Sequence, residues 1–217
     1  MKASRPVNIR RFQTRDLKQI ADIMAWSFKD KFQRLAPLPQ DDMSDFLAKA
    51  GVIYPSPFPG YLVAEDEGQG EVLGVMVLKW AKQDRPPAKP EWSKAGKYGW
   101  IKLGKLLIGL SLLVESNPHD GECYIEHITV RADARGAGIG TQLLEFGKAF
   151  TVQNGFKEYT LHVAASNESV IKLYEKLGFK IVRRERSLLS KWLFDIEEWY
   201  YMSQECHIAV KGADEGR

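Results

Sequence analysis

The chain has 217 residues, a length that suits one domain with a substantial core and leaves little room for two. Hydrophobic residues make up 44% of the sequence and charged residues 27%, which is typical of a soluble globular protein. The net charge of +3 is small for this length, so nothing favours a nucleic-acid-binding protein, which concentrates Lys and Arg on one face.

The first residues are charged and no apolar signal-peptide run follows them, so we expect a cytoplasmic protein. The two cysteines, Cys123 and Cys206, lie far apart and match no metal-binding spacing. The four histidines are scattered as well. We therefore expect no metal site.

The first third of the chain alternates strand and helix patterns. Residues 7–11 have the pattern of a strand, and the apolar spacing from Leu17 to Phe28 predicts an amphipathic helix after Thr14. A shorter helix is expected from Asp41 to Ala50. Residues 61–65 and 72–80 then predict a hairpin, whose second strand is apolar almost throughout. Such a strand is typical of a sheet that is covered on both faces.

Residues 81–121 have the composition of an insertion. Three prolines among charges predict a loop over residues 82–94, and residues 98–114 combine lysines with a long apolar run. The run is too short and too charged at its start to span a bilayer. Three interpretations stay open: a helix packed on the sheet, a lid over a substrate pocket, and a basic amphipathic helix at a membrane surface.

Residues 124–150 have the pattern of a strand, a glycine-rich loop and a helix. Tyr124 to Val130 is rich in aromatic and β-branched residues, and apolar residues recur at helical spacing from Leu143 to Phe150. The loop between them is Arg135-Gly136-Ala137-Gly138-Ile139-Gly140. Glycines let the backbone approach a ligand, and the first turn of a helix offers N–H groups to a phosphate. We therefore predict an anion-binding loop, to which Arg135 adds a charge.

The spacing excludes two common nucleotide-binding loops. A dinucleotide loop needs Gly-x-Gly-x-x-Gly, but the third glycine, Gly140, comes one residue early and Thr141 follows it. A Walker loop ends in Gly-Lys-Ser/Thr, which is absent. Glycines that only make a tight strand-to-helix connection are the simpler alternative.

A second strand–helix–strand unit follows. Residues 159–164 predict a strand, Asn167 has the character of a helix cap, and the next helix carries Tyr174 and ends at Gly178. Another strand begins at Phe179. We expect a bend after Ser187, a last strand over residues 198–204 and a frayed tail over residues 210–217.

The two units together resemble the GNAT superfamily of N-acyltransferases. The resemblance rests on Arg-x-x-Gly-x-Gly after an Ile-x-Val strand and on Asn167 followed by Leu-Tyr-Glu-Lys-Leu-Gly-Phe at residues 173–179, and it covers residues 124–182. It implies one α/β domain over residues 1–217, with a mixed central sheet of about six to seven strands flanked by helices and a helical insertion before the acyl-CoA strand. It also implies acetyl-CoA as cosubstrate. The residues implied to contact it are Ile128, Thr129, Val130, Arg135, Gly136, Ala137, Gly138, Ile139, Gly140, Thr141, Asn167 and Tyr174.

Acyl transfer to an amine needs a group that takes the amine proton. Strict alternation along the strand would place Glu126 on one face with Ile128 and Val130, whose family equivalents bind the pantetheine arm, and His127 on the other face. We therefore predict Glu126 as general base, acting through water, with Glu122 as the reserve. His127 has a suitable ordinary pKa, but its predicted orientation is unfavourable.

The leaving thiolate needs a proton donor, and the resemblance implies Tyr174. Asn167 and Tyr174 are seven residues apart, close to two helical turns, so both project from one side of the helix. Tyr174 could equally be a core aromatic residue by its periodicity alone. Cys123 shows no sign of activation, so we expect direct attack in a ternary complex and no acyl-enzyme.

The sequence thus predicts transfer of an acetyl group from acetyl-CoA to a primary amine. A small-molecule amine is the first choice of acceptor, and a protein N-terminus or lysine is the alternative. An interpretation from another class is a noncatalytic module that binds or senses acyl-CoA. We expect no nucleic-acid partner, and a monomer or a homodimer.

Overall fold

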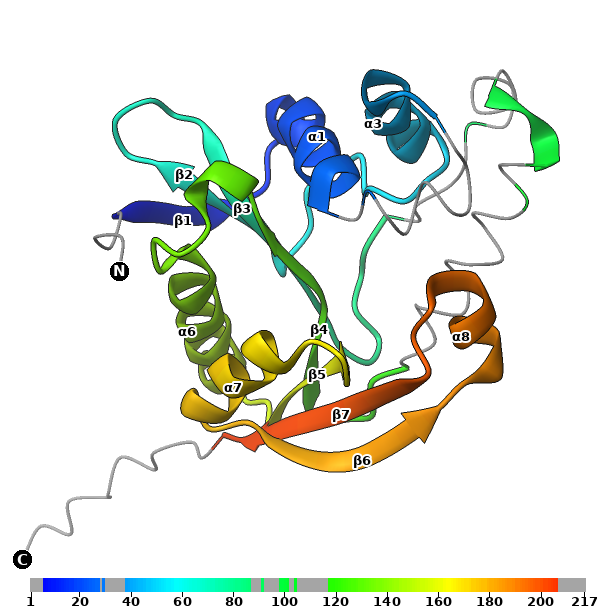
Figure 1. Ribbon diagram of the computed structural model, residues 1–217. Coiled ribbons are helices and arrows are strands. Elements are labelled where there is room, and N and C mark those ends of the chain that lie inside the picture. Colours follow the sequence, from blue (N-terminus) through cyan, green and yellow to red (C-terminus); the bar gives the residue numbers. More distant parts are fainter. Residues whose placement is uncertain are drawn as a thin grey trace, which may run out of the picture.

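The computed structural model describes residues 6–27, 38–86 and 117–206, together with residues 29, 91, 98–101 and 104. Within these residues, seven strands form one mixed sheet in the order β1-β2-β3-β4-β5-β7-β6 (Figure 1). The strands are β1 (Val7–Arg11), β2 (Tyr61–Asp66), β3 (Val72–Lys79), β4 (Glu122–Val130), β5 (Glu158–Ala164), β6 (Lys180–Arg186) and β7 (Glu198–Glu205). The helices are η1 (Thr14–Asp16), α1 (Leu17–Ser27), α3 (Gln40–Lys49), η3 (Ala132–Ala134), α6 (Ile139–Gln153), α7 (Glu168–Lys176) and α8 (Leu188–Phe194). The predicted α/β sheet of six to seven strands is confirmed.

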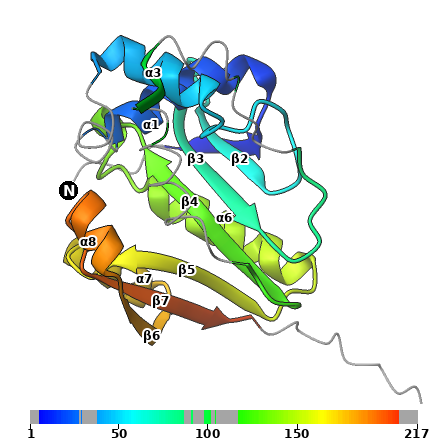
Figure 2. The same cartoon turned by 90° about the vertical axis from the view of Figure 1, so that its right-hand side faces the viewer.

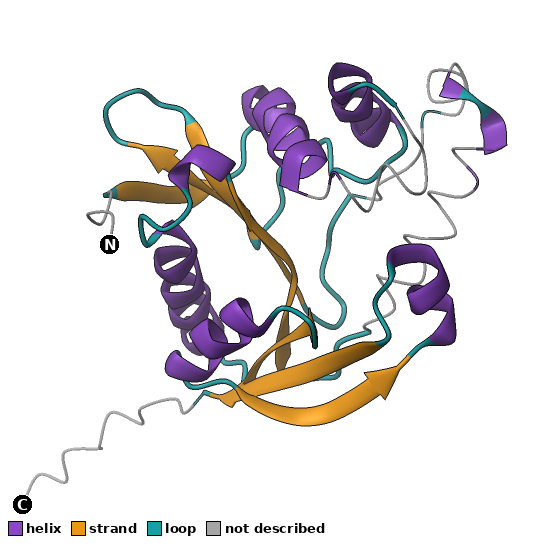
Figure 3. Ribbon diagram, viewed as in Figure 1, coloured by secondary structure: helices purple, strands orange, loops and turns teal. Residues whose placement is uncertain are grey.

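Helices cover the sheet on both faces (Figure 3). Helices α1 and α3 pack on one face, in a core that includes Val75 and Val77 of β3. Helices α6 and α7 pack on the other face, against Met76 and Leu78 of the same strand. Strand β3 is therefore buried on both sides, as its apolar sequence predicts.

All neighbouring strands are antiparallel except β4 and β5, which are parallel. Parallel neighbours need a crossover connection, and α6 supplies it. The crossover places the loop before α6 at the C-terminal end of β4. This is the usual place for a ligand in such a unit.

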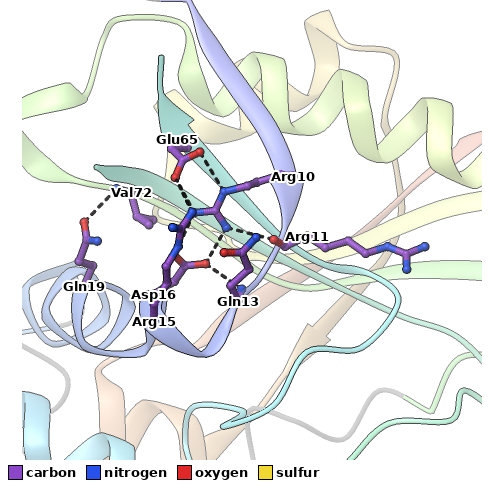
Figure 4. A network of polar contacts seen from close by, with 8 residues as sticks. All are labelled: Arg10, Arg11, Gln13, Arg15, Asp16, Gln19, Glu65 and Val72. Carbon is purple, nitrogen blue, oxygen red and sulfur yellow. Dashed lines mark hydrogen bonds and ion pairs between the residues drawn. The ribbon is translucent and has the colours of Figure 1, made fainter. Parts of the chain in front are cut away.

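A polar network joins β1, η1 and β2 near the edge of the sheet (Figure 4). The Arg10 guanidinium donates to both Asp16 oxygens at 2.7 and 2.9 Å and to both Glu65 oxygens at 2.6 and 2.9 Å. Asp16 also accepts the Gln13 backbone N–H at 2.8 Å, and its side chain is 2% exposed. Burial alone would raise the pKa of Asp16, but the hydrogen bonds from Arg10 and Gln13 hold it below its usual value.

One expectation for the C-terminal third is wrong. Residues 188–194, where we expected a bend, form helix α8. The Ser187 hydroxyl accepts the Ser190 N–H at its start, and Asp195, at a left-handed φ of 60°, ends it. A helix of seven residues has about two turns, too few for apolar periodicity to predict it. The local signal for this helix is the capping residue Ser187.

Two other expectations concern parts of the chain outside the described residues. Most of the segment 98–114 lies there, so its three interpretations stay predictions, and so does the tail 210–217. Among the helices that are described, none has the length and apolar character needed to cross a membrane.

Candidate acetyl-CoA and acceptor site

The glycine loop lies where β4 ends and α6 begins. Gly136 and Gly138 both have φ of 78°, a left-handed value that favours glycine, and Gly138 is the residue that caps α6. A Cβ atom on Gly136 would have no neighbour within 4 Å, so the loop is open on that side. The predicted strand, loop and helix are confirmed as an arrangement.

The loop presents backbone donors. Within the described part of the chain, the amides of residues 136–141 donate to no backbone carbonyl, and the first return bond of the helix runs from Gln142 N–H to Gly138 C=O at 3.0 Å. Unpaired amides at a helix N-terminus, next to its positive dipole end, suit a diphosphate. Arg135 lies beside them, donating to the Ser27 hydroxyl and the Val130 carbonyl at 3.2 Å each and stacking over the Trp26 ring.

Strands β4 and β5 separate next to this loop. They pair from Glu122 with Glu158 to Ile125 with Leu161, and no β4–β5 pair follows, although both strands are described to their ends. Figure 2 shows the two strands close at one end and apart at the other. We call this opening the β4–β5 split. The β4 edge beyond Ile125 therefore has backbone groups that an extended ligand can pair with.

A β-bulge at the split changes which side chains share a face. Val77 pairs with His127, but the next β3 residue, Leu78, pairs with Ile125, so Glu126 is an extra residue. Our prediction that Glu126 faces the same way as Ile128 and Val130 is therefore wrong. Glu126 and His127 both lie on the α1/α3 face, since Glu126 contacts Tyr54 and His127 is paired with Val77.

Glu126 is held by two partners on that face. The Tyr54 hydroxyl lies 3.1 and 3.0 Å from its two oxygens, and Arg85 Nη1 donates to Oε2 at 3.0 Å. Its side chain is 9% exposed, and Arg85 also stacks over the Tyr54 ring. A carboxylate offers about four lone-pair positions, so Glu126 can still accept a water or a substrate N–H.

The reserve candidate, Glu122, has a different environment. It is buried and accepts from the Thr160 hydroxyl at 2.5 Å, the Tyr201 hydroxyl at 2.9 Å and the His119 N–H at 3.0 Å. These partners occupy the carboxylate and join β4, β5 and β7. Glu122 thus has a structural role here.

A second titratable group lies on the other side of the split and was missed by the sequence reasoning. The Tyr124 hydroxyl is 3.1 Å from His162 Nδ1, and His162 Nε2 is 3.5 Å from Glu185. Burial lowers the pKa of His162, although Glu185 opposes this, so the imidazole is neutral near pH 7 and can take a proton. No motif marks this pair, because it depends on how β4 and β5 are paired.

Tyr174 lies on the α6/α7 face of the split. It is buried against Phe179, and its hydroxyl has no hydrogen-bond partner among the described residues. Burial raises the pKa of Tyr174 to about 12, so it stays protonated at neutral pH. Asn167 caps α7 by position, but its exposed side chain makes no cap hydrogen bond and so is available to a ligand.

The remaining predicted contacts lie along β4 and the loop. Ile128 packs with the α6/α7 core, while the Thr129 hydroxyl donates to Ser27 at 2.8 Å on the opposite face. In the described segments, no group of three or more His, Cys, Asp or Glu residues is placed so that it could hold a metal ion.

Comparison with known proteins places this arrangement in a family. The sequence profile of the acetyltransferase (GNAT) family matches residues 20–179. A solved structure described as an acetyltransferase superposes with a TM-score of 0.60 at 24% identity, covering 92% of this chain and 100% of that one. The ribosomal-protein-S18-alanine N-acetyltransferase of Escherichia coli superposes with a TM-score of 0.54 at 18% identity, covering 98% and 100%. These likenesses concern the fold.

Curated relatives match over shorter stretches. A probable N-acetyltransferase camello of Xenopus laevis is 38% identical over 82 residues, which is 37% of each chain. A mycothiol acetyltransferase of Corynebacterium aurimucosum is 39% identical over 67 residues, 31% of this chain and 21% of that protein. N-alpha-acetyltransferase 50 of Danio rerio is 33% identical over 75 residues, 34% and 45%. The matches thus span less than half of each of these three relatives, but the family profile covers most of this chain, and the chain belongs to the acetyltransferase (GNAT) family.

Proposed function

We propose that the protein transfers the acetyl group of acetyl-CoA to a primary amine. The observation that carries the proposal is the β4–β5 split, which opens a strand edge beside the amides of residues 136–141, and these donate to no backbone carbonyl of the described residues. The loop amides would hold the diphosphate, and the β4 backbone at Ile128 to Val130 would pair with the pantetheine arm. When bound, acetyl-CoA supplies the thioester whose acyl carbon the amine attacks.

The acceptor would approach from the α1/α3 face, where Glu126 lies. We propose that Glu126 takes the amine proton through a water, because its carboxylate is close to the split and has acceptor capacity beyond Tyr54 and Arg85. The Tyr124–His162 pair is the competing proton acceptor, because a neutral His162 imidazole can take a proton from the amine. The two candidates differ in position: Glu126 is on β4 and His162 is on β5.

Tyr174 would donate a proton to the leaving thiolate. Its hydroxyl is protonated at neutral pH and has no competing partner among the described residues, and α7 places it on the face opposite the acceptor. The backbone N–H groups of β4 beyond the bulge would polarise the thioester carbonyl.

We propose a small-molecule amine as acceptor. Charged side chains from separate elements, Glu126 of β4 and Arg85 of the loop after β3, meet beside the split and suit a compact polar ligand. The relatives include both a mycothiol acetyltransferase and an N-alpha-acetyltransferase, so a protein N-terminus is the second candidate.

The test is release of free CoA from acetyl-CoA by the purified chain, measured with a panel of amines. The panel contains polyamines, amino-acid amides, amino sugars and short peptides with free N-termini. We expect turnover with at least one small amine above the rate of spontaneous hydrolysis. CoA binding without turnover on any amine would instead favour the noncatalytic sensing module.

A further inference from the structure

His127 lies on the acceptor side of the sheet because of the bulge. Its direct partner on β3 is Val77, and the residue two positions on, Thr129, is paired with Val75. Both valines belong to the core under α1 and α3. Directly paired residues of antiparallel strands share a face, so the ring of His127 points away from α6 and α7.

The imidazole of His127 has hydrogen-bonding capacity that the described residues do not use. Within the described part of the chain, neither ring nitrogen has a hydrogen-bond or ion-pair partner, although the residue is partly buried. The other described histidines differ: His119 contacts Glu122, and His162 contacts Tyr124 and Glu185. A partly buried polar group without a protein partner is normally satisfied by water or by a ligand.

The chemistry of the ring defines the kind of ligand. Burial lowers the pKa of His127, and the neighbouring Glu126 carboxylate opposes this shift, so the ring is neutral near pH 7. A neutral imidazole accepts one hydrogen bond and donates one. It therefore suits a ligand with an N–H or O–H group better than an anion.

We propose that His127 binds the acceptor directly and helps to determine which amines the protein accepts. This inference rests on the proposed function. The acceptor is the relevant ligand because the glycine loop and Tyr174, which serve acetyl-CoA in that proposal, lie with α6 and α7 on the other face. Glu126 is one residue away, so the contact would fall next to the reacting amine.

The experiment measures KM separately for acetyl-CoA and for the best amine of the panel, in His127→Phe, His127→Ala and His127→Gln. Phe keeps a flat ring without nitrogens, and Gln keeps a hydrogen-bonding group. We expect roughly a tenfold rise in acceptor KM for Phe and Ala, a smaller rise for Gln, and acetyl-CoA KM within about twofold of wild type. His119→Ala, which removes an exposed imidazole at the far end of β4, is the matched control and should leave both constants unchanged.

The melting temperature of each variant shows whether a change in KM comes from lost binding or from lost folding. If His127→Ala does not fold, the acceptor KM of His127→Phe tests the inference. Acceptor KM values that stay at the wild-type level in a folded Phe variant would overturn the inference, and so would equal rises in both KM values. Both results leave the proposed function intact. Wild-type protein that turns over no amine would remove the proposed function, and the inference with it.

Discussion

At the sheet edge, Arg10 donates to both oxygens of Asp16 and of Glu65. At the β4–β5 split, by contrast, the Tyr174 hydroxyl, the His127 ring nitrogens and the loop amides have no hydrogen-bond partner within the described residues. Burying a polar group without a partner is costly, so folds usually satisfy such groups internally. The difference shows which polar residues hold the fold together and which ones leave capacity for a ligand.

Glu126 lies between these two classes, since it has internal partners and adjoins the split. Glu126→Gln should lower kcat by about a hundredfold or more, because the amide cannot take the amine proton, with acetyl-CoA binding kept. Steady-state kinetics and a binding titration measure the two effects. A kcat within twofold of wild type would assign the proton to the Tyr124–His162 pair.

Removing Arg10 tests the polar network that it forms with Asp16 and Glu65 at the sheet edge. Arg10→Met should reduce the free energy of unfolding by about 3 kcal/mol, because the buried Asp16 and the partly buried Glu65 lose the partner that donates to all four of their oxygens. Asp16 would keep the Gln13 N–H, and Arg15 would remain 4.0 Å from Asp16 and 3.7 Å from Glu65. Chemical denaturation measures this, and kcat of the folded fraction should not change. Arg11→Met, at an exposed neighbouring position, is the control and should stay within about 0.5 kcal/mol. Equal effects of the two variants would contradict the structural role.

Two tyrosines sharpen the comparison. Tyr201→Phe should reduce the free energy of unfolding by about 1–3 kcal/mol, because the change removes a hydrogen-bond donor from the buried carboxylate of Glu122.

Tyr174→Phe should lower kcat by roughly tenfold or more and leave the melting temperature nearly unchanged, because the Tyr174 hydroxyl has no hydrogen-bond partner within the described residues. Full activity in Tyr174→Phe would refute its role as the acid.

The smallest expected effect concerns pH. The hydrogen bonds from Arg10 lower the pKa of Glu65, and the balance of burial and hydrogen bonding lowers that of Asp16. Groups with a depressed folded-state pKa stabilise the fold above their unfolded pKa, near 4, and this contribution is lost as the pH falls further. Unfolding titrations from pH 6 to pH 3 should therefore show stability falling below about pH 4. The fall should be weaker in Arg10→Met, and an identical fall would show that other carboxylates cause it.

The sequence predicted those parts of the site that are built from residues adjacent in the chain. The glycine loop and the helix that carries Tyr174 each depend on a few adjacent residues, so their arrangement could be read from the sequence. The faces of β4 could not, because the extra residue at Glu126 appears only when β4 is paired with β3. The contact between Glu126 and Tyr54 spans 72 positions, and that between Tyr124 and His162 spans 38. Contacts between such distant positions follow from strand order and register, which a single sequence does not specify.

Isothermal titration calorimetry with CoA and with pantetheine, which lacks the diphosphate, tests the central claim most directly. If the amides of residues 136–141 hold the diphosphate, CoA should bind one to one and at least roughly tenfold more tightly than pantetheine. The account would be contradicted if CoA gave no binding heat, or if pantetheine bound as tightly as CoA.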